Sequence, residues 1–412
     1  MEVVYERCCG IDVHKRSVVA CRICRDEAGG IEKEIRRFGT MTDDLLALAD
    51  WLAAHQVSHV AMESTGSYWK PVWNVLEGEF ELLLVNPQHV KALSGNKTDV
   101  KDAGRLADFL RHGLLKASFV PNRAQRELRE LTRFRTSLVQ ERAAEVNRLQ
   151  KVLEGANIKL ASVASNILGK SGREMLEALL AGESAPQEMA ELARGRLREK
   201  IPQLERALAG RFGPHQRFMV AQQLAHIDFL DERIGEVSKE IGGRLRPFEH
   251  EIASRLDVIP GVAGVVTEVV LAEVGPDVSR FASADCLTSW AGICPGNNES
   301  AGKRKSGKTR KGNQALCTVL VQAAQAASMK TGSYLQAQFL RLAARLGRKK
   351  AIIALSRQIL VIIYHLLRHP TSVFSEKGAH YLREDQLERT RRHHVRRLEA
   401  LGFTVVLQPT AA

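Results

Sequence analysis

The sequence predicts an α/β domain at the N-terminus, followed by a long helical region and a mainly α-helical C-terminal domain. Three observations support this prediction. Residues 7–40 contain three short strand-like segments separated by turn or polar residues, which is typical of consecutive strands. Apolar strands and amphipathic helices then alternate up to about residue 110. Beyond residue 121 the apolar positions recur every three or four residues, which is the period of a helix.

The N-terminal domain is predicted to follow the order strand, strand, strand, helix, strand, helix, strand, helix. Three consecutive strands favour an antiparallel meander. This order is the layout of an RNase H-like fold, in which the acidic site lies where the central strands meet the last helix. The expected strands are 8–13, 17–24, 31–38, 59–62 and 81–85, and the expected helices are 42–55, 68–76 and 101–110.

Two long helices are expected in the middle of the chain. The first covers about 121–153, is charged and has sparse apolar positions. In the second, apolar residues step by three and four, which is the a/d seam of a coiled coil. We expect this seam to pack on another helix, either on residues 126–153 of the same chain or between chains in a dimer. The seam consists of Ile227, Leu230, Ile234, Val237 and Ile241.

A chain of 412 residues exceeds what one hydrophobic core usually supports, so two or three domains are expected. We expect a metal-binding domain over residues 1–120 and a helical, coiled-coil region over 121–250. A C-terminal domain follows over 251–370, and a basic helical tail over 371–412.

The charge balance favours a polyanionic partner. The chain has 60 Lys and Arg against 47 Asp and Glu, a net charge of +13, which suits nucleic acid. The N-terminus has no apolar signal core, and the apolar stretch 258–271 is interrupted by proline, glycine and glutamate. We therefore expect a cytoplasmic protein without a membrane partner. Cys21 and Cys24 form a lone pair with no matching second pair, which favours strand packing over zinc binding.

Four carboxylates lie at matching points of the predicted N-terminal domain. Asp12 lies inside an apolar first strand, where a carboxylate is costly to bury unless a cation compensates it. Glu63 follows the apolar strand 59–62, and Asp99 and Asp102 open the last helix, three residues apart on one face. Four oxygen donors suit hard divalent cations, so Mg²⁺ is the expected metal.

Each carboxylate also has an ordinary interpretation. Asp99 and Asp102 can cap a helix N-terminus, and Asp12 can be a turn residue. Taken singly, these interpretations are as good as the functional one. Taken together, acidic residues on three elements that meet in one domain favour a metal site.

The second candidate site is a loop, 294–313, that is rich in glycine and cations. Six of the nine residues from 303 to 311 are Lys or Arg, and the loop contains Ser300 and Ser306. Glycines allow close approach to a DNA backbone and cations neutralise phosphate. A basic linker that only binds phosphate is the alternative. The expected nucleic-acid-binding residues are Lys303, Arg304, Lys305, Lys308, Arg310 and Lys311. Upstream, the segment IPGVAG (259–264) before an apolar helix looks like a helix-hairpin-helix turn.

Several short motifs together resemble the DEDD transposases of the insertion-sequence one-ten family, in the order and at separations similar to those of that family. They are GIDVH (10–14), ESTG (63–66), NP (86–87), KTDVKD (97–102), IPGV (259–262), ESAG (299–302) and RKGN (310–313). The resemblance covers both outer domains.

The resemblance implies a RuvC-like domain that holds Mg²⁺ through Asp12, Glu63, Asp99 and Asp102. It also implies a second domain whose serine attacks DNA, and motif position assigns this role to Ser300, with Ser306 as the reserve candidate. In related enzymes the two domains form a composite site between protomers, and a structured RNA encoded by the element pairs with donor and target DNA. The resemblance therefore implies DNA, a guide RNA and a homo-oligomer, a dimer or tetramer, as partners.

Three functions compete. The first is a DNA transposase or recombinase that joins strands through a phosphoserine intermediate. The second is a RuvC-like hydrolytic junction resolvase or nuclease, in which the same carboxylates activate water and the C-terminal domain only binds DNA. The third is a non-catalytic nucleic-acid scaffold, which requires that the carboxylates bind no metal.

Overall fold

The computed structural model describes residues 2–25, 30–87, 90, 99–182, 185–245, 247–296, 298–300, 302–309 and 311–406. The chain divides into two compact units, Met1–Asn122 and Arg123–Ala412.

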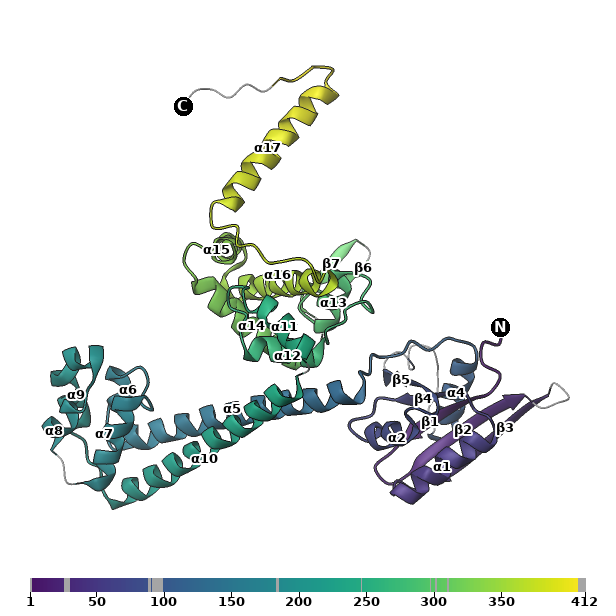
Figure 1. The fold of residues 1–412 in the computed structure, drawn as a ribbon, viewed down its shortest axis with the longest axis horizontal. Helices are drawn as coiled ribbons and strands as arrows, with labels where there is room; N and C mark the ends of the chain where they lie inside the picture. The colour runs from purple at the N-terminus through teal and green to yellow at the C-terminus, as the bar shows by residue number, and fades with distance from the viewer. Residues whose placement is uncertain are drawn as a thin grey trace. The chain divides into compact units, whose positions relative to one another are not determined.

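The first unit contains a five-stranded sheet in the order β3-β2-β1-β4-β5 (Figure 1). β2 runs antiparallel to β1 and β3, whereas β1, β4 and β5 are parallel. This is the order of an RNase H-like sheet, as the sequence predicted. The strands are β1 (Cys8–Val13), β2 (Val18–Arg25), β3 (Ile31–Phe38), β4 (His59–Glu63) and β5 (Glu81–Val85).

Helices cover both faces of this sheet. α1 (Thr42–Ala54) and α2 (Trp69–Leu76) share one core with the sheet, and α4 (Asp99–Arg111) shares a second core. Successive side chains of a strand point to opposite faces. β1 accordingly contributes alternate residues to the two cores, Cys9 and Ile11 to the first and Cys8 to the second.

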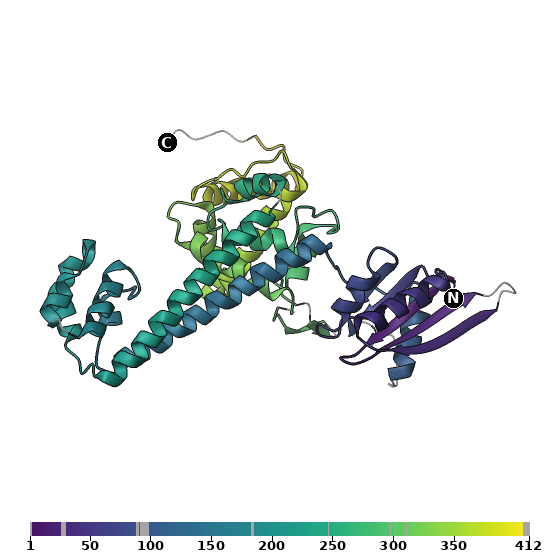
Figure 2. The same ribbon diagram turned by 60° about the horizontal axis from the view of Figure 1, so that its bottom comes forward.

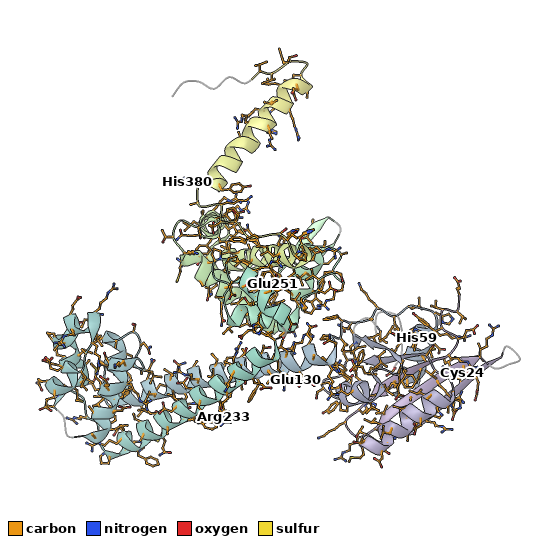
Figure 3. The ribbon with its side chains drawn as sticks, viewed as in Figure 1. Cys24, His59, Glu130, Arg233, Glu251 and His380 are labelled. Atoms are coloured by element: carbon orange, nitrogen blue, oxygen red, sulfur yellow. The ribbon has the colours of Figure 1, made fainter. Side chains whose placement is uncertain are left out.

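The Cys21–x–x–Cys24 pair lies in β2, where both thiols are buried. Cys21 belongs to the core under α4, and Cys24, labelled in Figure 3, to the core under α1 and α2. Burial raises the pKa of Cys21 to about 11. Since the two residues belong to opposite faces of the sheet, they do not form a shared zinc site, and the predicted packing role is confirmed.

The second unit begins with two long helices, α5 (Arg123–Gly155) and α10 (Pro214–Arg244), which lie side by side (Figures 1 and 2). Leu149 of α5 shares a core with Ile227 of α10, and Leu128 shares another with Ile241. The predicted packing of the second helix on the first, within one chain, is therefore confirmed. A coiled-coil supercoil and a contact between chains stay predictions.

Short helices join α5 to α10. They pack into one core with the ends of the two long helices. They are α6 (Leu160–Val163), α7 (Lys170–Ala181), α8 (Pro186–Glu191), η1 (Gly195–Lys200) and α9 (Ile201–Leu208).

The C-terminal part of this unit is mainly helical and has its own core. In the described part of the chain, one helix, α16, is long and apolar enough to cross a membrane by length and composition, and 50% of that window is buried in the fold. The elements are α11 (Pro247–Leu256), α12 (Val265–Glu273), α13 (Ala284–Ala291), β6 (Asn298–Ser300), β7 (Lys303–Ser306), α14 (Gln314–Met329), α15 (Tyr334–Leu346), α16 (Arg348–Arg368) and α17 (Tyr381–Ala400).

Candidate active site

Asp12 lies near the end of the central strand β1. Its neighbours Ile11 and Val13 are buried, whereas the Asp12 side chain is 14% exposed. His14 Nε2 lies 3.2 Å from Asp12 Oδ2. A mostly buried carboxylate requires compensation by a cation or by hydrogen bonds. His14 is one such neighbour, and the role of Asp12 as a metal ligand stays a prediction.

Helix α4 packs directly on β1 because residue 10 is a glycine. A Cβ atom on Gly10 would lie 2.3 Å from the Ala107 nitrogen and 2.4 Å from the Ala103 oxygen. The Cys8 thiol donates to the Ala107 oxygen at 3.7 Å. Along β1, then, residues nearer Asp12 lie beside earlier residues of α4. Asp12 lies two residues beyond Gly10, which is about 7 Å along the strand, and one helical turn is about 5 Å long. Asp12 should therefore lie a little more than one turn before the residues of α4 that contact Gly10, near the first turn of this helix.

Glu63 is the last residue of β4, and its Cα pairs with Val85 of β5. β1 and β4 are parallel, with Ile11 opposite Met62. Asp12 follows Ile11 and Glu63 follows Met62, so the two acidic residues occupy corresponding positions on adjacent parallel strands. The topology places them at the same end of the sheet.

Helix α4 begins at Asp99, as predicted for the pair Asp99 and Asp102. Asp102 Oδ1 lies 3.5 Å from Arg105 Nη1, and the side chain of Asp99 is outside the described residues. No three His, Cys, Asp or Glu side chains among the described residues form a metal-binding group. The donor set of Asp12, Glu63 and Asp102 consists only of carboxylate oxygens, which fits Mg²⁺ better than a soft metal.

The basic segment predicted as a flexible loop contains a short β-hairpin, which corrects that expectation. β6 and β7 are antiparallel, with Ser300 opposite Lys303 and Asn298 opposite Ser306. Gly302 in the turn has φ +72°, a conformation that glycine adopts without strain. The backbone pairing thus places Ser300 at the tip of the hairpin and Ser306 nearer its base.

Side chains of the hairpin are described only in part. Lys303, Lys308 and Lys311 are exposed. The predicted roles of Ser300, Ser306, Arg304, Lys305 and Arg310 fall on side chains outside the described residues.

The base of the hairpin is fixed by backbone contacts. The Gly296 nitrogen donates to the Lys308 oxygen at 3.0 Å, and Pro295 and Thr309 form an isolated bridge. Residue 312 has no space for a side chain, because a Cβ atom on Gly312 would lie 2.4 Å from the Gly292 nitrogen. The tip that bears Ser300 therefore extends from an anchored base.

A buried carboxylate ties this base to the long helix α5. Glu273, at the end of α12, is fully buried. The Arg133 guanidinium donates two hydrogen bonds to Glu273, Nε to Oε1 at 2.7 Å and Nη2 to Oε2 at 2.9 Å. Arg129 Nε lies 3.4 Å from Oε2, and Asn313 Nδ2 donates to Oε2 at 2.6 Å. Burial lowers the pKa of Arg129 to about 10, and the Glu273 charge opposes this shift.

Sequence reasoning missed Glu273, although a signal was present. Glu273 lies in the apolar run of α12, where an acidic residue needs a partner, and the same argument had singled out Asp12. Asn313 belongs to the RKGN motif, and its Oδ1 accepts from the Leu316 nitrogen at 3.1 Å as the N-cap of α14. One side chain therefore caps α14 and contacts the buried carboxylate.

The IPGVAG segment joins α11 to α12 and packs on α14. Gly261 has φ +82°, and a Cβ atom there would lie 2.2 Å from the Ala323 oxygen. Close packing of this turn on α14 thus explains Gly261. A helix-hairpin-helix contact with phosphate stays a prediction.

Comparison with known proteins gives two matching family models. A family model described as a transposase, of the DEDD type of IS110, matches residues 9–158. A second, described as "Transposase IS116/IS110/IS902 family", matches residues 253–340. The chain belongs to the IS110 family of DEDD transposases. It is therefore a DNA-processing enzyme.

Relatives and a solved structure show similarity along the chain. The transposase for insertion sequence element IS1111A of Coxiella burnetii is 26% identical over 327 residues, covering 77% of this chain and 79% of that protein. The insertion element IS116 uncharacterized 44.8 kDa protein of Streptomyces clavuligerus is 27% identical, covering 66% and 71%. The Thermus thermophilus RuvC structure matches with 14% identity and a TM-score of 0.21, covering 27% of this chain and 99% of that one.

Proposed function

We propose that this transposase cuts and rejoins DNA through a nucleophilic Ser300, assisted by Mg²⁺ held by Asp12, Glu63, Asp99 and Asp102. The observation that carries the proposal is the place of Ser300 at the tip of an anchored hairpin, opposite Lys303 and before Gly302. Small neighbouring residues and a lysine at the paired position of the hairpin favour the close approach of a phosphate.

The chemical step is an exchange of phosphodiester bonds. Ser300 Oγ attacks phosphorus and forms an Oγ–P bond while one P–O bond to a sugar breaks. The Oγ proton leaves to a base, and the departing sugar oxygen takes up a proton. The phosphoserine linkage conserves the bond energy, so a DNA hydroxyl can later attack the same phosphorus and release the serine.

A serine hydroxyl is a weak nucleophile at neutral pH and needs a base or a metal beside it. When bound at the carboxylates, Mg²⁺ supplies Lewis-acid stabilisation of the charged phosphate oxygens. The exposed cations Lys303, Lys308 and Lys311 bind the DNA backbone and position the strand. The carboxylate domain and the serine domain must therefore dock during the reaction, within one chain or between protomers.

The remaining assignments follow from the family. We propose that a structured RNA encoded by the element pairs with donor and target DNA, and that the enzyme is a cytoplasmic homo-oligomer. We also propose functional domains over 1–120, 121–250, 251–370 and 371–412, with the carboxylates in the first and Ser300 in the third.

The decisive experiment is a denaturing gel of protein mixed with labelled element-end DNA, element RNA and Mg²⁺. We expect a protein-linked DNA band for the unmodified chain and for Ser306→Ala, and none for Ser300→Ala. Adducts that survive in Ser300→Ala but vanish in Ser306→Ala would transfer the role to Ser306.

The same gel separates transposition from junction hydrolysis. The RNase H-like domain contains its carboxylates whether or not a serine takes part, so a hydrolytic resolvase is the second candidate. It predicts free cleaved ends with no protein-linked band at any time. A time course beginning within seconds of Mg²⁺ addition would detect a short-lived adduct.

A further inference from the structure

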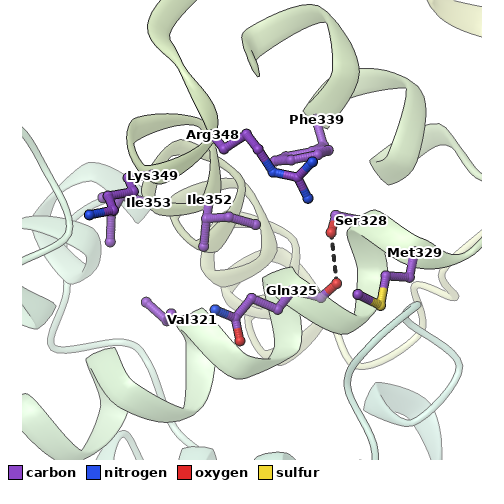
Figure 4. Close-up of a pocket in the computed structure, with 9 residues that line it drawn as sticks. All are labelled: Val321, Gln325, Ser328, Met329, Phe339, Arg348, Lys349, Ile352 and Ile353. Atoms are coloured by element: carbon purple, nitrogen blue, oxygen red, sulfur yellow. Dashed lines mark hydrogen bonds between the residues drawn. The ribbon is translucent and has the colours of Figure 1, made fainter. Parts of the chain in front are cut away.

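An apolar groove with a cationic rim lies between α14, α15 and α16 (Figure 4). Met329, Phe339, Ile352 and Ile353 line it with apolar surface, and Arg348 and Lys349 lie at its edge. Its volume is about 530 Å³, within the range of roughly 300–1,000 Å³ that is usual for small-molecule sites. A single nucleobase has flat π faces that pack on apolar and aromatic side chains, and polar edges.

The charged side chains of the three helices that form the groove are all basic, although Glu376, outside them, accepts from the Tyr334 nitrogen of α15 at 2.8 Å. None of α14, α15 and α16 contains an acidic residue, and the sequence has no Asp or Glu from residue 300 to 375. Five exposed cations lie at and before the turn from α15 to α16 and form no ion pair with the described residues. They are Arg341, Arg345, Arg348, Lys349 and Lys350. Such a surface is complementary to a polyanion.

The position of three of these cations opposes helix stability. Arg348, Lys349 and Lys350 occupy the first turn of α16, next to its N-cap Gly347. The N-terminus of a helix has a positive partial charge, which favours Asp or Glu there and disfavours Lys or Arg. Arg348 lies over the Phe339 ring, whereas Lys349 and Lys350 form no ion pair with the described residues. A local arrangement that costs stability in this way indicates a function. An anion bound at this turn would provide the compensation.

Apolar groups beside the cations also lack cover. Met329 is 77% exposed and Leu340 is 59% exposed. The Arg348 guanidinium carbon lies 5.8 Å from the centre of the Phe339 ring, so the groove has both an aromatic and a cationic component. Sites for single-stranded nucleic acid combine these features, with cations along the backbone and apolar or aromatic side chains against the bases.

We propose that the α14–α16 groove binds an unpaired DNA strand, with one base in the groove and the neighbouring phosphates on the cations of the α15–α16 turn. The proposal rests on the proposed strand exchange, because cutting and rejoining two duplexes leaves bases unpaired. Binding requires neither Ser300 nor Mg²⁺. The groove would hold a displaced strand while the hairpin and the carboxylates act on the phosphodiester.

A photocrosslink tests the location. A twelve-nucleotide oligothymidine containing one 5-iododeoxyuridine is irradiated with the full chain carrying Ser300→Ala, and the crosslinked tryptic peptides are identified by mass spectrometry. We expect crosslinks in peptides 312–330 and 331–341, which contain Met329 and Phe339. Crosslinks confined to other peptides, such as those of α17 or the hairpin, would overturn the proposal.

Affinity measurements test the contribution of the base. We expect Met329→Asp to weaken binding of the oligothymidine about ten-fold, since one base contact contributes about 1–3 kcal/mol. The same substitution should weaken the binding of an abasic oligonucleotide of equal length less than it weakens the binding of the oligothymidine. Met41→Asp is the matched control, because Met41 is also an exposed methionine, 71% exposed, in the other unit. Equal effects of the two substitutions, or no difference between the two oligonucleotides, would contradict base binding in the groove.

A charge variant tests the phosphate contacts. Lys349→Gln with Lys350→Gln should reduce the salt dependence of binding, lowering the slope of log K against log salt by about 1.4 for two phosphates of a single strand. Arg396→Gln with Arg397→Gln removes the same charge from exposed positions of α17. If the slope falls equally in both double variants, the lysines contribute only non-specific attraction to DNA, and the proposed phosphate contacts beside the groove are wrong. An acidic protein partner, the alternative occupant, predicts no crosslink in the groove.

Discussion

Asn313 donates a 2.6 Å hydrogen bond to the fully buried carboxylate of Glu273. Asn313 ends the basic segment and caps α14, whereas Glu273 ends α12 and is paired with Arg133 of α5. This pair therefore joins the base of the serine hairpin to the long helix. A buried charge with several fixed partners defines one arrangement of the elements that supply them.

Exchanging the two residues tests this connection. Asn313→Asp places a carboxylate against Glu273, and we expect a lower melting temperature and fewer protein-DNA adducts because like charges repel at this distance. Asn313→Asp with Glu273→Gln restores one donor and one acceptor and keeps the charge of the cluster unchanged. The double variant should regain melting temperature and adducts. Independent, additive losses would show that the contact does not position the hairpin.

Removing the Glu273 side chain should lower the stability of the protein more than removing one partner of an exposed ion pair. Glu273→Ala leaves Arg129 largely buried without its acidic partner, and breaking such a pair costs about 3–5 kcal/mol. Glu236→Ala removes the exposed partner of Arg233 on α10, where we expect at most about 1 kcal/mol. Thermal melting followed by circular dichroism compares the two. Similar melting temperatures would contradict the importance of the buried network.

The carboxylate site predicts a defined loss of cleavage. Asp12→Asn and Asp102→Asn should each reduce DNA cleavage about 100-fold or more, which is the usual cost of removing one electrostatic contact in a preorganised site. DNA binding should persist. Asp108→Asn is the matched control, because Asp108 lies on the same helix and forms only an exposed ion pair with Lys33. Chelation of divalent metal by EDTA should abolish cleavage, and activity without added metal would contradict the assignment.

Close packing of α4 on β1 predicts opposite outcomes for two glycines. Gly10→Ala forces a methyl group within 2.4 Å of the α4 backbone, so we expect about 1–3 kcal/mol of destabilisation or more, together with lost cleavage. Gly104 lies on α4 itself, where an added Cβ atom would lie 3.2 Å from the flexible end of Lys33 and 3.9 Å, an ordinary contact, from Cys21 Sγ. Alanine favours a helix by up to about 1 kcal/mol over glycine. Melting temperatures of the two variants test this, and a stable Gly10→Ala protein would refute the packing.

The basic hairpin predicts a change in salt dependence. Lys303→Gln and Lys308→Gln should each lower the slope of log K against log salt for duplex DNA by about 0.9, the value for one phosphate contact. Lys239→Gln, at an exposed position of α10, removes one charge away from the hairpin. Anisotropy titrations at several salt concentrations measure the slopes. Identical slopes in all three variants would assign these lysines to non-specific attraction.

Local sequence patterns determined the secondary structure of the N-terminal domain. The runs 8–13, 31–38 and 81–85 correspond to observed strands with the same bounds, and the alternation of strands and helices predicted the RNase H-like layout. Apolar periodicity likewise predicted that α10 packs on another helix, because the side of a helix that excludes water can be read from its spacing. The unusual cost of a carboxylate in an apolar strand singled out Asp12 by the same logic.

Tertiary structure alone decided which distant residues meet. No periodicity indicates that Gly10 lies against Ala103 or that Asn313 contacts Glu273, because such contacts depend on how whole elements pack. The sequence allowed the a/d seam to pack either on a second chain or on α5. The structure shows that Ile227 and Ile241 share cores with residues of α5. The hairpin was also hidden, since the strands are only three and four residues long and lack apolar alternation. The hairpin is held by backbone pairing between its strands and by contacts at its base, and neither can be read from a local sequence pattern.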